Sequence, residues 1–102
     1  MGVKHLTSAD FDEVTGKGRV LVDFWAGWCM PCRMVAPVIE GLAADFVGTA
    51  TIAKVDTDSE QQLAVRFGIT GIPTVIVFQD GTEIKRLIGV QPKESYEEAL
   101  RG

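Results

Sequence analysis

The feature that most limits the possible folds is the run Arg19-Val20-Leu21-Val22-Asp23-Phe24-Trp25. β-Branched and aromatic residues follow one another there, without the alternation of apolar and polar side chains that marks a half-exposed strand. Such a run is typical of a strand whose two faces are both covered by other elements. The sequence therefore predicts a central strand over 19–25, in a sheet with helices on both sides.

Strand and helix patterns alternate along the rest of the chain. Four further segments have the composition of strands: 3–5, 51–55, 74–79 and 83–88. Four segments have helical spacing or helix-start signals: 7–16, 29–46, 60–67 and 92–100. The Asp80-Gly81 pair between the last two strands is a strong hairpin signal. The order β-α-β-α-β-α-β-β-α predicts an α/β fold, with one mixed five-stranded sheet flanked by four helices.

Length and charge narrow the possible functions. The 102 residues predict one domain over 1–102. A net charge of −4, with no run of like charges, excludes the basic surface that binding to nucleic acid or to an acidic membrane needs. The apolar runs are too short to span a bilayer, and the first residues lack the apolar core of a secretory signal. We therefore expect a soluble protein with neither nucleic acid nor a membrane as partner.

The two cysteines lie in one tetrapeptide, Cys29-Met30-Pro31-Cys32, between the predicted central strand and the helix that follows it. Residues three apart share one face of a helix and lie within reach of a disulfide bond. The pair can therefore be oxidised and reduced in place. Its position also agrees with the rule that sheets of this class bind ligands at the carboxyl ends of their strands.

The two thiols are expected to have different roles. Cys29 falls near the helix N-terminus, where free backbone N–H groups and the helix dipole favour a thiolate. We expect Cys29 to attack a substrate disulfide, and Cys32, one turn further into the helix, to attack the Cys29 sulfur and release the reduced product. Pro31 suits the first helical turn and stiffens the loop.

Two other interpretations of the cysteine pair stay open at this point. Half of a zinc site would need two more soft ligands, and the chain offers no third cysteine and a single histidine, His5. The second alternative is a pair of buried structural cysteines. No metal is expected, and no nucleotide cofactor either, because no complete nucleotide-binding motif occurs.

The segment Trp25-Ala26-Gly27-Trp28-Cys29-Met30-Pro31-Cys32 resembles the active-site segment of the thioredoxin family. The order of predicted elements also matches that fold from Val3 to Leu100. The similarity continues at five further places: 22–24, 34–37, 54–56, 71–74 and Gly89. Met30 departs from the family, which usually has glycine between the first cysteine and the proline.

The resemblance implies a thiol-disulfide oxidoreductase that reduces disulfides in other proteins and is itself re-reduced by a thioredoxin reductase. It also implies a cytoplasmic monomer whose only redox group is the Cys29–Cys32 pair, with no bound cofactor. Two alternatives remain. A thiol oxidase or disulfide isomerase is suggested only by Met30, and a non-enzymatic binding module could use the same fold.

Asp23 is a carboxyl group within a buried apolar strand, a placement that raises the pKa of an acid. By resemblance it is the buried acid beneath the cysteine pair, which passes a proton to or from Cys32. A structural ion pair with Lys54 on a neighbouring strand is the alternative role, and the two roles are compatible.

The resemblance further implies a substrate-binding surface around Cys29. An extended substrate would bind there through main-chain hydrogen bonds, which accept many sequences, beside a cis peptide bond at Ile72-Pro73. The expected residues of this surface are Trp28, Met30, Gly71, Ile72, Pro73 and Gly89. A core position is the alternative for Trp28, and Trp25 is expected to pack beneath the site.

Overall fold

The computed structural model describes residues 2–102, so that Met1, the first residue of the predicted domain, lies outside the described part. The elements, in chain order, are β1 (Lys4–His5), α1 (Phe11–Thr15), β2 (Arg19–Trp25), α2 (Met30–Asp45), β3 (Thr51–Asp56), α3 (Gln61–Arg66), β4 (Thr74–Gln79), β5 (Thr82–Ile88) and α4 (Lys93–Arg101). This is the predicted order, and apart from the start of the first helix the ends of the elements agree with the prediction to within one residue.

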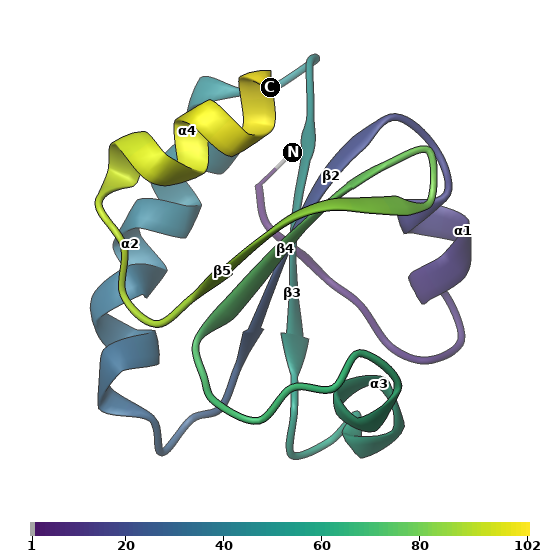
Figure 1. Ribbon diagram of the computed structural model, residues 1–102, viewed down its shortest axis with the longest axis vertical. Helices are drawn as coiled ribbons and strands as arrows, with labels where there is room; N and C mark the ends of the chain where they lie inside the picture. Colours follow the sequence, from purple (N-terminus) through teal and green to yellow (C-terminus); the bar gives the residue numbers. More distant parts are fainter. Residues whose placement is uncertain (1) are drawn as a thin grey trace.

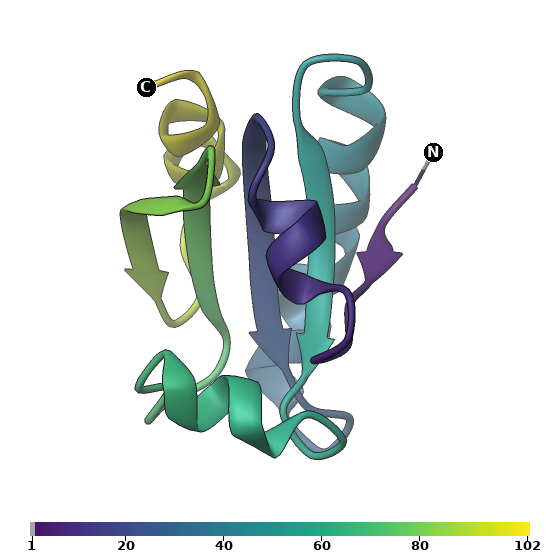
Figure 2. The same ribbon diagram turned by 90° about the vertical axis from the view of Figure 1, so that its right-hand side faces the viewer.

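The five strands form one mixed sheet in the order β1-β3-β2-β4-β5 (Figure 2). β3 is parallel to both β1 and β2, whereas β4 is antiparallel to β2 and to β5. Helices α2 and α4 cover one face of the sheet, and α1 and α3 cover the other (Figure 1). The prediction of a central strand at 19–25 is confirmed, because residues 20–24 of β2 are all inaccessible to solvent.

One apolar core lies on each face of the sheet at β2, since successive side chains of a strand point to opposite faces. Val20, Val22 and Phe24 point to the side of α1 and α3. Leu21 points to the opposite side, where it packs with residues of α2 and α4. A cluster of four aromatic rings fills much of the first core: Phe11, Phe24, Phe67 and Phe78.

The first helix begins later than predicted. One of the two bonds of a capping box forms, since Asp10 Oδ1 accepts from the Thr7 N–H at 2.7 Å, whereas Thr7 Oγ1 accepts from the Ala9 N–H at 3.2 Å and not from that of Asp10. Residues 8–10 nevertheless form turns, and the α-helix begins only at Phe11. The sequence signal therefore marks the beginning of a tight turn that leads into the helix.

The predicted hairpin joins β4 to β5. Asp80 and Gly81 have φ values of 50° and 87°, the left-handed conformation that a two-residue hairpin turn requires and that glycine adopts without strain. The β4–β5 ladder also contains an irregularity. Val77 pairs with Lys85 but Phe78 pairs with Glu83, so that Ile84 is an extra residue in β5.

Replacing Phe11 by alanine tests the aromatic core. Phe11 is 1% exposed and its ring lies against those of three other phenylalanines, so Phe11→Ala should lower the free energy of unfolding by about 3 kcal/mol. Urea denaturation measures the change. Val65→Ala is the control, because Val65 is 81% exposed and its truncation should change stability by less than about 0.5 kcal/mol. Equal effects of the two substitutions would contradict this description of the core.

Candidate active site

The cysteine pair lies where β2 passes into α2. A short turn follows the strand, in which the Cys29 N–H donates to the Ala26 carbonyl oxygen at 3.2 Å. Cys29 is the N-cap of α2, and Pro31 occupies the first turn, where its missing N–H costs nothing. The Cys32 N–H donates to Cys29 Sγ at 3.2 Å. The predicted helix start at the cysteines is therefore confirmed.

Cys29 and Cys32 are joined by a disulfide bond, with their Cα atoms 5.3 Å apart. Both residues are buried, and they pack with Ala26, Trp25 and Ile72. Trp25 thus lies beneath the site as expected. The first turn of α2 contains no acidic residue, so nothing there opposes the preference of the helix N-terminus for a negatively charged sulfur at Cys29.

A groove of about 520 Å³ runs beside the disulfide. Its lining residues are Trp28, Cys29, Met30, Pro31, Thr57, Ala64, Ile69, Thr70, Gly71 and Ile72. Cys29 faces the groove, whereas Cys32 is absent from its lining. The carbonyl oxygen of Ile72, another lining residue, is in contact with Cys29 Sγ at 3.7 Å.

The structure gathers most of the predicted binding residues at this groove. Trp28, Met30, Gly71 and Ile72 line it, whereas Pro73 and Gly89 are not among the lining residues. The Ile72-Pro73 peptide bond is cis. The Pro73 carbonyl oxygen accepts from the Gly89 N–H at 2.8 Å, so these two residues are hydrogen-bonded to each other directly after the lining residue Ile72.

Large apolar side chains surround the groove on the outside. Trp28 is 71% exposed, which makes the core alternative for this residue wrong, and Met30 is 64% exposed. Met34 belongs to the apolar pattern of the second predicted helix, but the structure leaves it 67% exposed. It lies one turn after Met30 on α2, so both methionines point toward solvent.

The predictions from sequence missed four residues that line the groove, Thr57, Ala64, Ile69 and Thr70, and also Asp58, which contacts Trp28 outside the lining. Thr57 and Asp58 follow β3, which lies next to β2 in parallel, so the carboxyl ends of both strands meet at one edge of the sheet. The Thr57 N–H donates to the Trp25 carbonyl oxygen at 2.9 Å, and Asp58 Oδ2 accepts from Trp28 Nε1 at 3.0 Å. The same strand-end rule that nominated Cys29 would have found these two residues.

Asp23 lies on the face of β2 that is covered by α2. Its neighbours on that face of the strand are Leu21, which packs with residues of α2, and Trp25, which packs against the disulfide. The carboxyl group is inaccessible to solvent, and neither of its oxygens has a hydrogen-bond partner in the protein. Asp23 is thus an unpaired acid in an apolar environment.

The expected ion pair between Asp23 and Lys54 does not form. The two residues are opposite each other in the parallel β2–β3 ladder. Among residues 2–102, however, the ion pairs do not include Asp23, and Lys54 Nζ lies 4.6 Å from the centre of the Trp25 ring. A cation over an indole ring is itself stabilising, and this position keeps the ammonium group near water.

The environment of Asp23 changes its ionisation. Burial raises the pKa of Asp23 from 3.8 to about 7, because the charged form loses its hydration, and the positive charge of Lys54 opposes part of this rise. An acid with this pKa can both accept and donate a proton near neutral pH.

Comparison with known proteins decides the family. The sequence model described as "Thioredoxin" matches residues 2–102. The chain belongs to the thioredoxin family. Thioredoxins from Staphylococcus aureus strains MW2 and COL are each 48% identical to it over 100 residues, which are 98% of this chain and 96% of theirs. A solved mutant thioredoxin from Halobacterium salinarum NRC-1 is 35% identical, has a TM-score of 0.89, and the match covers 98% of this chain and 88% of that one.

Membership of the thioredoxin family, together with the disulfide-forming pair, makes the protein a thiol-disulfide oxidoreductase, an enzyme that reduces protein disulfides. Thioredoxins use the cysteine pair itself as the redox group and need no bound cofactor. Within residues 2–102, no group of three or more His, Cys, Asp or Glu side chains is placed to hold a metal ion. Over the same residues, the helices are too short or too polar to cross a membrane.

Replacing Asp23 by asparagine tests the buried acid. The folded-state pKa of Asp23 is about 7, above the unfolded value of 3.8, so the folded protein loses stability as pH rises from about 4 to about 7. Asp23→Asn removes this dependence. The stability of the variant relative to wild type should therefore rise by about 2 to 3 kcal/mol between about pH 5 and about pH 8.

Urea denaturation of the oxidised proteins at the two pH values measures this difference. Val65→Ala is a suitable control, because Val65 is exposed and has no titratable group, so that its replacement should leave the pH dependence unchanged. If the difference in free energy of unfolding between Asp23→Asn and wild type is the same at both pH values, Asp23 has an ordinary pKa.

Proposed function

We propose that Cys29 is the nucleophile with which this enzyme reduces disulfides of other proteins. The observation that carries the proposal is the asymmetry of the cysteine pair: Cys29 lies at the N-cap of α2 and faces the groove, whereas Cys32 lies one turn further in and does not line the groove. In the reduced protein, the Cys32 N–H and the helix N-terminus stabilise the Cys29 thiolate. Its sulfur attacks one sulfur of the substrate disulfide and forms a mixed disulfide, and the other substrate sulfur leaves as a thiolate.

Cys32 and Asp23 complete the reaction. Cys32 gives its proton to Asp23, directly or through a water molecule, and then attacks Cys29 Sγ. The second substrate thiolate leaves, and the enzyme is left with the Cys29–Cys32 disulfide. What supports the role of Asp23 is its pKa of about 7 and its place on β2 next to Trp25, which packs against the disulfide. Lys54 is the second ionisable group in this region, and its positive charge lowers the pKa of Asp23, against the effect of burial.

The groove beside Cys29 would receive an extended segment of the substrate protein. Trp28 and Met30 offer exposed apolar surface, and the open space above Gly71 admits a second main chain. The Ile72 carbonyl oxygen, beside Cys29 Sγ, can accept a substrate N–H. Pro73 and Gly89 hold this wall in place, and Pro31 fixes the turn between the cysteines. Main-chain recognition of this kind accepts many protein sequences.

A reductase would return the protein to its dithiol form, as expected for the thioredoxin family. We further propose that residues 1–102 act as a single domain and a monomer in the cytoplasm. A reducing compartment suits the proposed direction of electron flow, because disulfides there are kept scarce. Analytical ultracentrifugation that shows a dimer at micromolar concentration would contradict the monomer.

Trapping the mixed disulfide tests the division of roles between the cysteines. The reduced Cys32→Ser variant should accumulate a covalent complex with a disulfide substrate such as insulin. Cys29 still attacks the substrate, but no second cysteine is present to break the mixed disulfide. Cys29→Ser should form no such complex and should lose all turnover. Non-reducing gel electrophoresis and mass spectrometry identify the complex and the residue involved. A stable complex through Cys32 in Cys29→Ser would reverse the assignment.

The redox potential of the pair tests the direction of electron flow. Tryptophan emission in graded thiol-disulfide buffers should give about −270 mV, the value known for thioredoxin. Trp28 lies next to Cys29 and is a natural reporter. A potential of about −120 to −180 mV would instead indicate an oxidase or isomerase. Met30→Gly, measured in parallel, shows how much Met30 contributes.

A further inference from the structure

The groove wall opposite Cys29 is a short connection, residues 68–73, which we call the docking loop. It joins the end of α3 to the start of β4 and carries four of the groove residues, Ile69 to Ile72. The Ile72 carbonyl oxygen lies 3.7 Å from Cys29 Sγ. The place of this loop therefore decides the width of the groove and the position of the main-chain groups that a substrate would meet.

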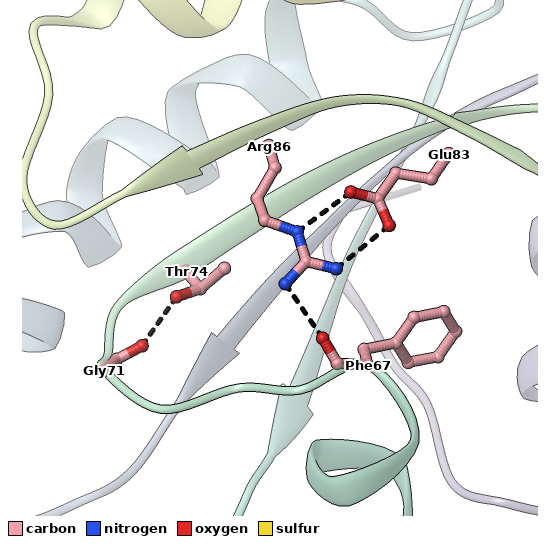
Figure 3. Close-up of polar contacts among 5 residues, drawn as sticks. All are labelled: Phe67, Gly71, Thr74, Glu83 and Arg86. Carbon is pink, nitrogen blue, oxygen red and sulfur yellow. Dashed lines mark hydrogen bonds and ion pairs between the residues drawn. The ribbon is translucent and has the colours of Figure 1, made fainter.

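Both ends of the docking loop are tied to other parts of the protein (Figure 3). Just before the loop, the Phe67 carbonyl oxygen accepts from Arg86 Nη1 at 2.8 Å. Near its end, Thr74 Oγ1 donates to the Gly71 carbonyl oxygen at 2.6 Å. The Thr74 bond is local, whereas Arg86 reaches the loop from the edge strand β5, 19 residues further along the chain.

The geometry of Arg86 suits it to hold a main-chain oxygen in one place. Phe67 is the C-cap of α3, so its carbonyl oxygen is among those without a partner inside the helix. A cation at this end of a helix also complements the helix dipole. Glu83 holds the same guanidinium group by two hydrogen bonds, from Nε at 2.8 Å and from Nη2 at 2.9 Å. A planar guanidinium with three bonds has little freedom to turn.

The irregularity in β5 makes this arrangement possible. Residues three apart in a regular strand point to opposite faces of the sheet, so Glu83 could not reach Arg86. Ile84 is the extra residue of the β4–β5 ladder, and Glu83 and Arg86 therefore pair with Phe78 and Ile76. Phe78 and Ile76 belong to one core, on the face covered by α1 and α3. The bulge thus turns both charged side chains toward the end of α3.

We propose that Arg86, oriented by Glu83, is a positioning residue that fixes the docking loop at the distance from Cys29 that binding of a protein substrate requires. The inference rests on the proposed function, in which this loop presents its main chain to the substrate. Arg86 does not line the groove and touches no reacting atom. Its loss should weaken binding of protein disulfides while the chemistry of the cysteine pair continues.

The test compares Arg86→Met with Lys85→Met. Both substitutions remove one positive charge from β5 and keep an unbranched apolar stem, but the exposed Lys85 pairs with Val77 and points to the opposite face. With insulin as the protein disulfide and dithiothreitol as the electron donor, Arg86→Met should raise KM about fivefold and change kcat less than about twofold. Lys85→Met should leave both parameters at the wild-type values.

Three measurements separate positioning from general damage. The rate with the small disulfide hydroxyethyl disulfide and the redox potential should both be unchanged in Arg86→Met, since Arg86 contacts neither cysteine and a small disulfide does not need the full docking surface. Arg86→Lys should recover part of the affinity for insulin, because a lysine can still donate to one oxygen. Amide hydrogen exchange at Ile69 to Ile72 should accelerate in Arg86→Met and not in Lys85→Met.

Several results would overturn the proposal. One is a KM for insulin in Arg86→Met equal to that in Lys85→Met, and another is an equal loss of activity toward insulin and hydroxyethyl disulfide. If Arg86→Met does not fold, Glu83→Gln takes its place as the test variant. Its KM for insulin should be higher than that of the wild type, and an unchanged KM would contradict the proposal. Failure of the wild-type protein to reduce insulin would overturn the proposed function itself. If the wild-type protein reduces insulin and the variants have the same KM as the wild type, only this inference is overturned.

Discussion

The burial of β2 on both faces is the constraint on which the rest of the structure depends. A strand with five consecutive solvent-inaccessible residues must have neighbours in the sheet on each edge and helices above and below it. α1 and α3 satisfy one face and α2 and α4 the other, so neither core exists without this strand. The end of β2 is held rigidly as a result, and the cysteine pair follows it after three residues. The redox site is therefore built at the end of the central strand, which is buried on both faces.

The same burial gives the site its acid. Asp23 occupies a position where an apolar side chain would be more stable, and neither of its oxygens has a hydrogen-bond partner in the protein. Because burial disfavours the charged carboxylate, the pKa of Asp23 is raised to about 7, and its protonated and ionised forms are about equally populated at neutral pH. Lys54 opposes this effect through space but remains over the Trp25 ring. A direct ion pair would hold the carboxylate in its charged form and make it a weaker proton acceptor. Stability is thus lower at a place where proton transfer is useful.

The two walls of the groove are built in different ways. Cys29 and its neighbours belong to the beginning of a long helix, whereas the opposite wall is a loop between a short helix and a strand. Such a loop needs contacts from elsewhere to keep a fixed position. The hydrogen bond from Arg86 and the support of Pro73 by Gly89 supply them, and both come from β5 or the residue that follows it. An edge strand that lines no part of the groove therefore contributes to its shape.

Much of this structure could be predicted from local sequence patterns. The apolar run of β2, the Asp80-Gly81 turn and the spacing of the cysteines each depend on residues close together in the chain, and each prediction was confirmed. The resemblance of the segment around Cys29 to thioredoxins added the family, which comparison with known proteins then showed.

Other features depend on which residues meet across the sheet, and local patterns do not contain that information. The extra residue Ile84 brings Glu83 and Arg86 to one face, and the parallel register of β2 and β3 brings Thr57 to the groove and Asp58 to the Trp28 indole. The direction of the Lys54 side chain, toward Trp25 instead of Asp23, follows from the competition between two nearby partners. The sequence by itself determined the elements, their order and the reactive pair, because these follow from short-range periodicity and helix-end chemistry. Only the tertiary structure decided that Asp23 has no hydrogen-bond partner and which residues complete the groove, because both depend on contacts between residues distant in the chain.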